Sequence, residues 1–346
     1  MWLVSARDLL WRKRRFLIAV VSASMVFSLT LVLEGLISHI TNEATRVVDR
    51  FDADVWIVAP GESGPFTSST LLNESTLDEV AALPEVIRAE SMIAARDTID
   101  DTWVNVLGYD PGGALESTSL TSGRMPRQSD EAVVDGALGY RIGTSISVGG
   151  KPFQVVGVGH GLAYSFGAPT LLIPVDGVQR ALLDGQPAIG AIAVEGTVDR
   201  LPDGLRSMSS ADVVADMRVG MDQSLQIVTI LNGLLWAIAA AILASMVYLS
   251  TLERVRDFAV MKAIGVSNRS LHLGLASSSL LLAVLAALGG AILAFVLGPR
   301  FPMEVDTPSS AYVTLLVVAV VVGLITSSIA LRRAVRVDPA LAFGGG

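Results

Sequence analysis

Four long apolar runs dominate the pattern of hydrophobic and polar positions along the chain. They cover residues 16–37, 227–250, 273–297 and 311–331, and the only Asp, Glu, Lys or Arg inside any of them is Glu34, near the far end of the first run. About 20 consecutive apolar residues are needed to cross roughly 30 Å of hydrocarbon as a helix, which satisfies its own backbone hydrogen bonds there. The pattern therefore predicts four transmembrane helices.

The first apolar run follows a basic cluster, as the core of a secretion signal would. Arg12, Lys13, Arg14 and Arg15 precede it, but no A-x-A-type cleavage site follows. The run is also longer than the roughly 7–15 residues of a signal-peptide core, so we interpret it as an uncleaved anchor. Residues 1–15 are expected to form an amphipathic helix along the inner membrane face, with a basic cluster that only sets topology as the alternative.

Basic residues near the ends of the runs predict the orientation of the chain in the membrane. Residues 1–15, 251–272 and 332–346 together hold twelve Lys or Arg against four acidic residues, which predicts that they are cytoplasmic. Residues 38–226 hold twelve Lys or Arg against twenty-six Asp or Glu, so this domain and the short loop 298–310 are expected outside. The chain is predicted to be a multi-pass protein of the cytoplasmic membrane. Its acidic external domain argues against nucleic-acid binding.

The external segment combines helix, strand and turn signals. A helix with a capping box of Thr76 and Glu79 is expected within a small α/β unit over 54–110, and a hairpin that turns at Gly149 and Gly150 is expected within a strand-rich part over 131–173. The predicted fold class is a membrane α-helical protein of four transmembrane helices, with an α+β extracytoplasmic domain inserted between the first and the second. The individual predictions are helix at 42–51, 175–183 and 209–226, and strand at 54–58, 86–93, 103–107, 145–148, 153–158, 170–173 and 191–195.

The cytoplasmic segment between the second and third runs carries the most informative pattern. We call residues 252–265 the coupling segment. On a helix, Leu252, Val255 and Phe258 fall on one side at three-residue spacing, while charged residues face elsewhere, and Gly265 is a typical helix C-cap. A loop that only sets topology needs basic residues but not an amphipathic helix. We therefore predict a helix that docks onto a cytoplasmic partner.

Three stretches of the sequence resemble a known family. ERVRDFAVMKAIGVSNRSL is similar to the E-R-x-R-E-x-A-x-x-x-A-x-G-A segment of MacB/FtsX/LolC-type ABC permeases, most closely the DevC-like branch, with Asp257 and Val266 as conservative departures from Glu and Ala. RRAVRVDPALAF resembles the basic D-P-a-x-A-L ending of that family. SGRMPRQSDEAVVDGALGYRIGTSISVGGKPFQVVGV resembles its external G-R-x-P-x-x-x-x-E stretch.

The resemblance implies a type VII ABC system, in which a permease homodimer transmits ATP-driven motion to its external domains. The ATPase is then a separate dimer that holds ATP and magnesium, because no G-x-x-x-x-G-K-[ST] motif occurs in this chain. No cofactor is expected here. The resemblance implies that the coupling helix is seated on the ATPase, and the residues expected at that contact are Glu253, Arg254, Arg256, Asp257, Phe258, Ala259, Lys262, Ala263, Ile264 and Gly265.

Two rows of small residues and one acidic residue are the candidates inside the membrane. Small residues four apart let helix backbones approach closely, so the rows are candidates for packing between two copies, although the alanine-rich composition alone could supply them. Glu34 is a candidate polar site for a substrate or a proton, or it reaches water or caps a partner. The two rows are Ala237, Ala241 and Ser245, and Ala286, Gly290 and Ala294.

Catalysis by this chain is not expected. It has no cysteine, and His39, His160 and His272 lie on both sides of the membrane, so no metal site is predicted. The leading function is export or extraction of an amphipathic substrate, and membrane lipid is a further expected partner. The alternative is an FtsX-like lever that regulates an external cell-wall hydrolase without transport, so an extracytoplasmic adaptor or hydrolase is a further candidate partner. A plain receptor anchor would need neither the coupling helix nor three further spans.

Overall fold

The computed structural model describes residues 13–61, 63–165, 167–253, 260–261, 264–301 and 304–335. They form two compact units. The transmembrane unit comprises Met1–His39 and Leu225–Gly346, and the ectodomain unit comprises Ile40–Ser224. The predicted amphipathic helix over 1–15 lies almost wholly outside the described residues, which begin at Lys13.

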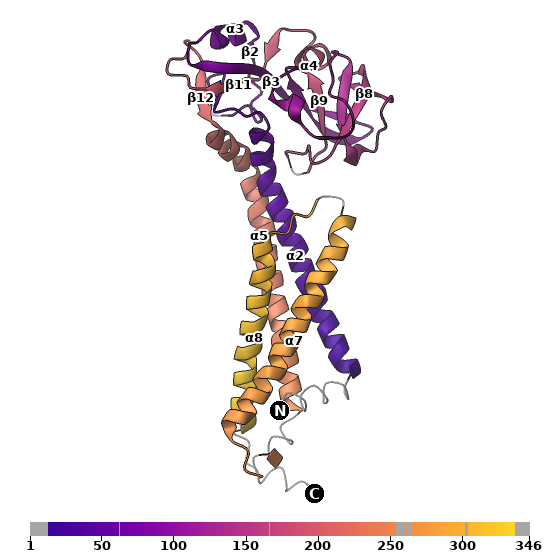
Figure 1. Ribbon diagram of the computed structural model, residues 1–346, viewed down its shortest axis with the longest axis vertical. Coiled ribbons are helices and arrows are strands. Elements are labelled where there is room, and N and C mark those ends of the chain that lie inside the picture. The colour runs from indigo at the N-terminus through magenta and orange to yellow at the C-terminus, as the bar shows by residue number, and fades with distance from the viewer. Residues whose placement is uncertain are drawn as a thin grey trace. The chain divides into compact units, whose positions relative to one another are not determined.

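Four long helices each contain one of the predicted apolar runs (Figure 1). All four are long and apolar enough to cross a membrane, which agrees with the fold class expected from the sequence. The 3-10 turn η3 (Gly298–Arg300) follows the third of them. The four helices are α2 (Lys13–Asp49), α5 (Ser210–Leu252), α7 (Asn268–Leu297) and α8 (Ser309–Val335).

A ten-stranded sheet forms the centre of the ectodomain unit, in the order β12-β1-β11-β3-β4-β9-β6-β8-β5, with β7 paired to β8. β4 pairs parallel with β9, and β6 pairs parallel with β8, while the other pairs are antiparallel. The strands are β1 (Val55–Val58), β3 (Val86–Ile99), β4 (Thr102–Tyr109), β5 (Leu120–Gly123), β6 (Glu131–Asp135), β7 (Ser145–Val148), β8 (Lys151–Gly159), β9 (Thr170–Pro174), β11 (Ala191–Gly196) and β12 (Arg206–Ser209), with β2 (Leu72–Asn73) and β10 (Ala188–Ile189) paired separately.

Two tight hairpins use residues in the left-handed backbone region. Gly149 and Gly150 have φ of 55° and 73° between β7 and β8, so the predicted glycine turn is confirmed. A Cβ at Gly149 would lie 2.2 Å from the carbonyl oxygen of Ala181, which excludes a side chain there. The turn between β3 and β4 is made by Asp100 and Asp101, at φ of 46° and 63°, because Asp tolerates this region better than most residues.

The sheet has a buried core on each face. Neighbouring residues of a strand point to opposite sides, so they belong to different cores. On one face, Ile57 packs in a core that includes α3 (Ser75–Ala81) and α4 (Val175–Leu182). On the other face, Trp56 packs with Val47 at the end of α2 and Val213 near the start of α5. The ends of two long helices are therefore part of the ectodomain core.

The structure corrects two local expectations. The helix α3 begins at Ser75 after Glu74, and no side chain caps it, so the capping box predicted for Thr76 and Glu79 is wrong. The turn is fixed instead by Asn73, whose Oδ1 accepts from the Ser75 amide at 3.0 Å. The α/β part over 54–110 and the strand-rich part over 131–173 also share one sheet, because β9 pairs with β4.

Candidate functional site

The core of the transmembrane unit consists mainly of alanine with a few large side chains. Phe27 and Leu31 of α2 are fully buried in one cluster with Leu243 of α5, Ala283 of α7 and Ala319 of α8. All four helices therefore contribute to a single core. Small side chains bring the helix backbones close enough for carbonyl groups to accept interhelical hydrogen bonds.

The small-residue row of α7 packs against α2 of the same chain. The Ser24 hydroxyl of α2 donates to the Ala286 carbonyl at 3.1 Å. A Cβ at Gly290 would lie 2.7 Å from the Cβ of Phe27, so only glycine fits there. Ala294 is 4% exposed. This row packs within the chain, and a role between two copies in addition to that contact stays a prediction.

The small-residue row of α5 has the opposite environment. Ala237, Ala241 and Ser245 are all exposed on the surface of the transmembrane unit. Only 17% of the apolar window in α5 is buried, against 44% in α2. This row is therefore accessible to lipid or to another helix, and packing between two copies stays a prediction for it.

Glu34 has a partner on a different span. The side-chain amide of Asn232, in α5, donates a hydrogen bond to Glu34 Oε2. Asn232 is 4% exposed, and its Oδ1 has no hydrogen-bond partner among the described residues. The contact agrees with the alternative in which Glu34 caps a partner. The signal from which this contact could have been predicted is a lone amide, Asn232, in an apolar run.

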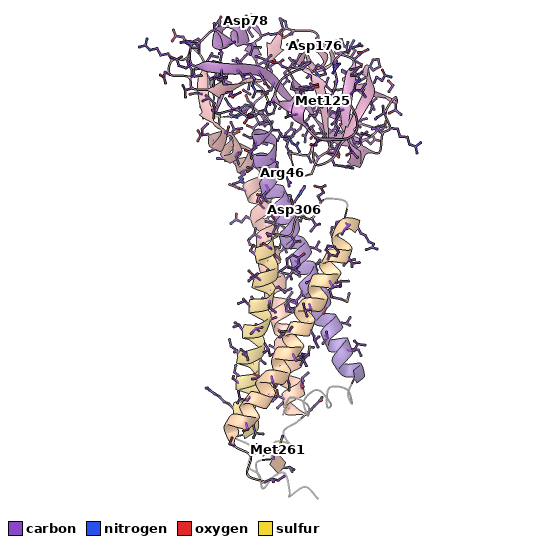
Figure 2. All side chains as sticks on the ribbon, in the orientation of Figure 1. Arg46, Asp78, Met125, Asp176, Met261 and Asp306 are labelled. Carbon is purple, nitrogen blue, oxygen red and sulfur yellow. The ribbon has the colours of Figure 1, made fainter. Side chains whose placement is uncertain are left out.

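The segment between η3 and α8 packs on α2 near the external end of the first span. The Asp306 amide donates to the Gly35 carbonyl at 3.2 Å, and the Thr307 hydroxyl donates to the Leu31 carbonyl at 3.2 Å; Figure 2 shows Asp306 beside α2. A Cβ at Gly35 would lie 2.5 Å from Thr307 Oγ1. His39 is 4.0 Å from the carboxylates of Glu304 and Asp306. A cavity of about 600 Å³ adjoins this segment.

Of the coupling segment, the structure describes residues 252–253, 260–261 and 264–265. The end of its helix has the geometry of a Schellman cap: Gly265 has φ of 92°, and the Val266 amide donates to the Met261 carbonyl at 3.0 Å. The C-cap predicted at Gly265 is confirmed. Ser267 then caps α7, since its hydroxyl accepts from the Ser270 amide at 3.3 Å. Of the predicted contact residues, Glu253, Ile264 and Gly265 are described, whereas Arg254, Arg256, Asp257, Phe258, Ala259, Lys262 and Ala263 lie outside the described residues.

Hydrogen bonds and aromatic contacts tie the ends of α2 and α5 together inside the ectodomain unit. Trp56 Nε1 donates to Ser210 Oγ at 3.1 Å, and Ser210 Oγ donates to the Ala53 carbonyl at 2.6 Å. Arg218 Nη2 donates to the Thr41 carbonyl at 2.9 Å. The Phe51 ring contacts Trp56 edge-on with ring centroids 5.0 Å apart. Sequence reasoning did not foresee these ties, because their partners lie far apart in the chain.

The external G-R-x-P-x-x-x-x-E stretch forms an ion pair between a buried Glu131 and a half-exposed Arg124. Arg124 makes two contacts with Glu131, at 2.7 Å and 2.5 Å, and the Arg127 amide donates to Glu131 Oε2 at 2.9 Å. The Glu131 side chain is 7% exposed. Its hydrogen bonds to Arg124, together with those from backbone amides, lower the pKa of Glu131 to about 2, against the opposing effect of burial. The motif therefore stabilises the ectodomain fold.

Two family descriptions together match nearly all of the chain. The MacB-like periplasmic core domain matches residues 17–204, and the FtsX-like permease C-terminal domain matches residues 229–339. The order of the two matches follows the first span with its external domain and then the remaining spans. This chain belongs to the MacB/FtsX-type ABC transporter permeases.

Relatives of this permease agree with that family. It is 40% identical over 348 residues, covering all of both chains, to the uncharacterized ABC transporter permease Mb2592 of Mycobacterium bovis. It is 19% identical, over 98% of each chain, to the protein of Staphylococcus epidermidis named as hemin transport system permease HrtB. Among solved structures, the periplasmic region of MacB from Actinobacillus actinomycetemcomitans covers 49% of this chain and 94% of its own, at 16% identity and a TM-score of 0.37.

Family and structure together establish the class of the permease. It is a multi-pass protein of the cytoplasmic membrane with a large external α+β domain. Permeases of ABC transporters are not themselves enzymes, and membership of the family implies a partner ATPase subunit. Among the described residues, no group of three or more His, Asp or Glu side chains is arranged to hold a metal ion.

Proposed function

We propose that this permease converts ATP hydrolysis by a separate ATPase into movement of its ectodomain, and that the movement extracts or exports an amphipathic substrate. One observation carries the proposal. The ends of α2 and α5, the two helices through which the chain passes between its units, are built into the ectodomain core. The core residues concerned are Ala44, Val47 and Val48 of α2 and Val213 and Met217 of α5.

Burial of these helix ends makes a mechanical connection physically reasonable. Protein cores are close-packed, so a helix that shifts must move its packing partners or lose contacts with them. Trp56 of β1 contacts the Phe51 ring just after the end of α2 and donates to Ser210 at the start of α5. A displacement of either helix would therefore reach the sheet directly, without a flexible linker between them.

The ATPase contact is proposed for the coupling segment. Its support is the resemblance of residues 252–265 to the family segment, together with the Schellman cap at Gly265 and the Ser267 cap, which end one helix and start the next within three residues. Phe258 is the one aromatic residue in the segment, and aromatic residues are frequent anchors of interfaces. Arg254 and Arg256 would then lie at the rim.

Truncation of Phe258 tests the ATPase contact. Phe258→Ala should weaken association of the ATPase with the permease in nanodiscs by about 2 kcal/mol or more, which is roughly thirtyfold in Kd. Phe301→Ala is the matched control, because Phe301 is exposed and belongs to the predicted external loop. Association that is unchanged by Phe258→Ala, or equally weakened by Phe301→Ala, would contradict the assignment of the coupling segment.

Assembly as a homodimer through α5 is part of the proposal. The exposed row of Ala237, Ala241 and Ser245 offers a surface on which two helices can approach closely, whereas the row of α7 is covered by α2. The chain has no native cysteine, so single cysteines can be introduced cleanly. Ala237→Cys should form disulfide-linked dimers on oxidation in membranes, and Ala286→Cys should not. Equal cross-linking at both positions would refute the arrangement.

Transport and a signalling lever differ in whether a substrate leaves the membrane. The permease with its ATPase should release an amphipathic substrate from lipid vesicles only while ATP is hydrolysed. If ATP hydrolysis changes the activity of an external cell-wall hydrolase and no amphiphile is released, the result would favour the signalling lever.

A further inference from the structure

The ectodomain unit contains a cavity of about 430 Å³ that the proposed function does not use. It lies between the start of β4, the segment that precedes β9, and the first turns of α5. This volume falls within the range of small-molecule sites, about 300–1,000 Å³. The large side chains of the lining are aromatic or thioether groups, apart from Arg96: Phe66, Trp103, Tyr164, Met217 and Met221.

The exposure of Trp103 indicates that the cavity is open to a ligand. Its side chain is 70% exposed although it lines the cavity. Tyr164 and Phe66 pack edge-on with ring centroids 5.4 Å apart, and both are almost fully buried, so the back of the cavity is rigid. An apolar group could therefore be enclosed between this buried aromatic wall and the exposed indole of Trp103.

Arg96 supplies a positive charge at the cavity in an otherwise acidic domain. Its one hydrogen bond is a long contact of 3.4 Å from Nη2 to Ser165 Oγ, and it forms no ion pair with a carboxylate among the described residues. Arg88 and Arg124, by comparison, are each paired with a glutamate. The Arg96 guanidinium therefore keeps most of its donors for another anion.

The hydroxyl of Tyr164 is a second group without a partner. Tyr164 is 3% exposed and lines the cavity, yet its hydroxyl makes no hydrogen bond within the described part of the chain. Burial raises the pKa of Tyr164, and the nearby charge of Arg96 opposes that rise. The phenol is thus a protonated donor at neutral pH.

The remaining polar side chains of the cavity are already engaged. The Thr67 hydroxyl bonds to Asp216, and the Asn105 amide donates to the Ala168 carbonyl at 3.3 Å. The Ser165 hydroxyl accepts from Arg96, so Arg96, Tyr164 and Ser165 all keep donors that no carboxylate occupies, beside apolar side chains. Their chemistry matches an acidic group attached to an apolar body.

We propose that this cavity binds an anionic amphiphile, with its acidic group on Arg96 and Tyr164 and its apolar body against Phe66, Met217 and Trp103. This inference rests on the proposed function, in which the ectodomain handles an amphipathic substrate. It adds that this substrate carries a negative charge. A neutral or cationic amphiphile of the same shape would leave the donors of Arg96 unpaired and should bind more weakly.

The test uses the full-length permease in nanodiscs without its ATPase, with 8-bromooctanoate as the probe. Bromine quenches indole fluorescence on contact, so binding should quench Trp103 in a saturable manner, and Trp103→Phe should abolish the saturable part. The matched neutral probe 8-bromooctanol should bind about tenfold more weakly or worse, because a hydrogen bond to a charged group is lost. Arg96→Gln should weaken binding of the anion to a similar extent, and Tyr164→Phe by about threefold.

Arg141→Gln is the control for the change in charge, because Arg141 is exposed and does not line the cavity. It should leave binding of 8-bromooctanoate unchanged. Quenching that does not saturate, equal affinity for the two probes, or an unchanged affinity in Arg96→Gln would each overturn the assignment. These results are separable from the proposed function, since loss of ATPase association would refute that function and would not alter this titration.

Discussion

Removing the charge of Glu131 should destabilise the ectodomain at neutral pH. The Glu131 side chain is 7% exposed, and its carboxylate accepts two bonds from Arg124 and others from backbone amides. Glu131→Gln keeps the shape of the side chain but removes the charge. The amide nitrogen of the new Gln would face N–H groups that now donate to the carboxylate. Two donors cannot bond to each other, so at least one buried hydrogen bond is lost.

The magnitude follows from the pKa of Glu131. The structure lowers that pKa from an ordinary 4.5 to about 2, chiefly through hydrogen bonds from Arg124. Each unit of such a shift corresponds to roughly 1.4 kcal/mol, which would give about 3 kcal/mol. The Arg124 side chain is 50% exposed, so water screens the pair, and we expect a loss of about 2 kcal/mol. For a domain of this size that loss lowers Tm by roughly 4–8 °C.

The pH dependence of the loss distinguishes this explanation from a packing defect. A carboxylate whose pKa is lowered in the folded state stabilises the fold fully above about pH 4.5, and this contribution fades as the pH falls toward 2. The difference between wild type and Glu131→Gln should therefore shrink to less than half by pH 3.

Thermal unfolding of the full chain in detergent measures the effect, followed by tryptophan fluorescence with Trp56 as a reporter in the ectodomain core. Glu79→Gln is the control, because Glu79 is exposed and makes no contact of this kind. A difference between wild type and Glu131→Gln that is the same at pH 7 and pH 3, or one that Glu79→Gln reproduces, would refute the reasoning.

Two predictions concern the transmembrane unit. Gly290→Ala should destabilise the helix core by about 1–3 kcal/mol, because the new Cβ would press on Phe27. Gly233→Ala is the control and should be neutral, since its Cβ would meet no atom within 4 Å. The thermal aggregation of the two variants in detergent measures the difference. Asn232→Leu alone should be more destabilising than the double variant Glu34→Leu with Asn232→Leu. The single change leaves the Glu34 carboxyl without its donor inside the membrane. A double variant that is no more stable than Asn232→Leu would contradict this.

The sequence by itself determined the elements and the topology of this permease. Twenty apolar residues without a charge are a membrane span in any tertiary context, because the bilayer is the solvent that selects them. Turns are local in the same way. Two consecutive glycines at 149 and 150 adopt a conformation that few other residues reach, and Gly265 ends a helix wherever the helix lies. Similar reasoning predicted most strands of the ectodomain, since their alternation is a property of each strand alone.

The sequence also identified the coupling segment, through its amphipathic rhythm and its resemblance to the family. What docks there is decided by another polypeptide, and that contact stays a proposal. For the candidate residues inside the membrane, the sequence determined the helix face but not the partner of that face. The spacing of Ala286 and Gly290 shows that both lie on one face of a helix, but not which helix covers that face.

The tertiary structure decided the pairings between distant residues. It turned the row of α7 toward Phe27 and Ser24 and left the row of α5 exposed, although the two rows look alike in sequence. It also joined Glu34 to Asn232, and it paired the sheet halves through β4 and β9. Local patterns fix which side of an element is apolar, because that depends on period alone. The partner of each side depends on how the whole chain packs, and only the folded chain contains that information.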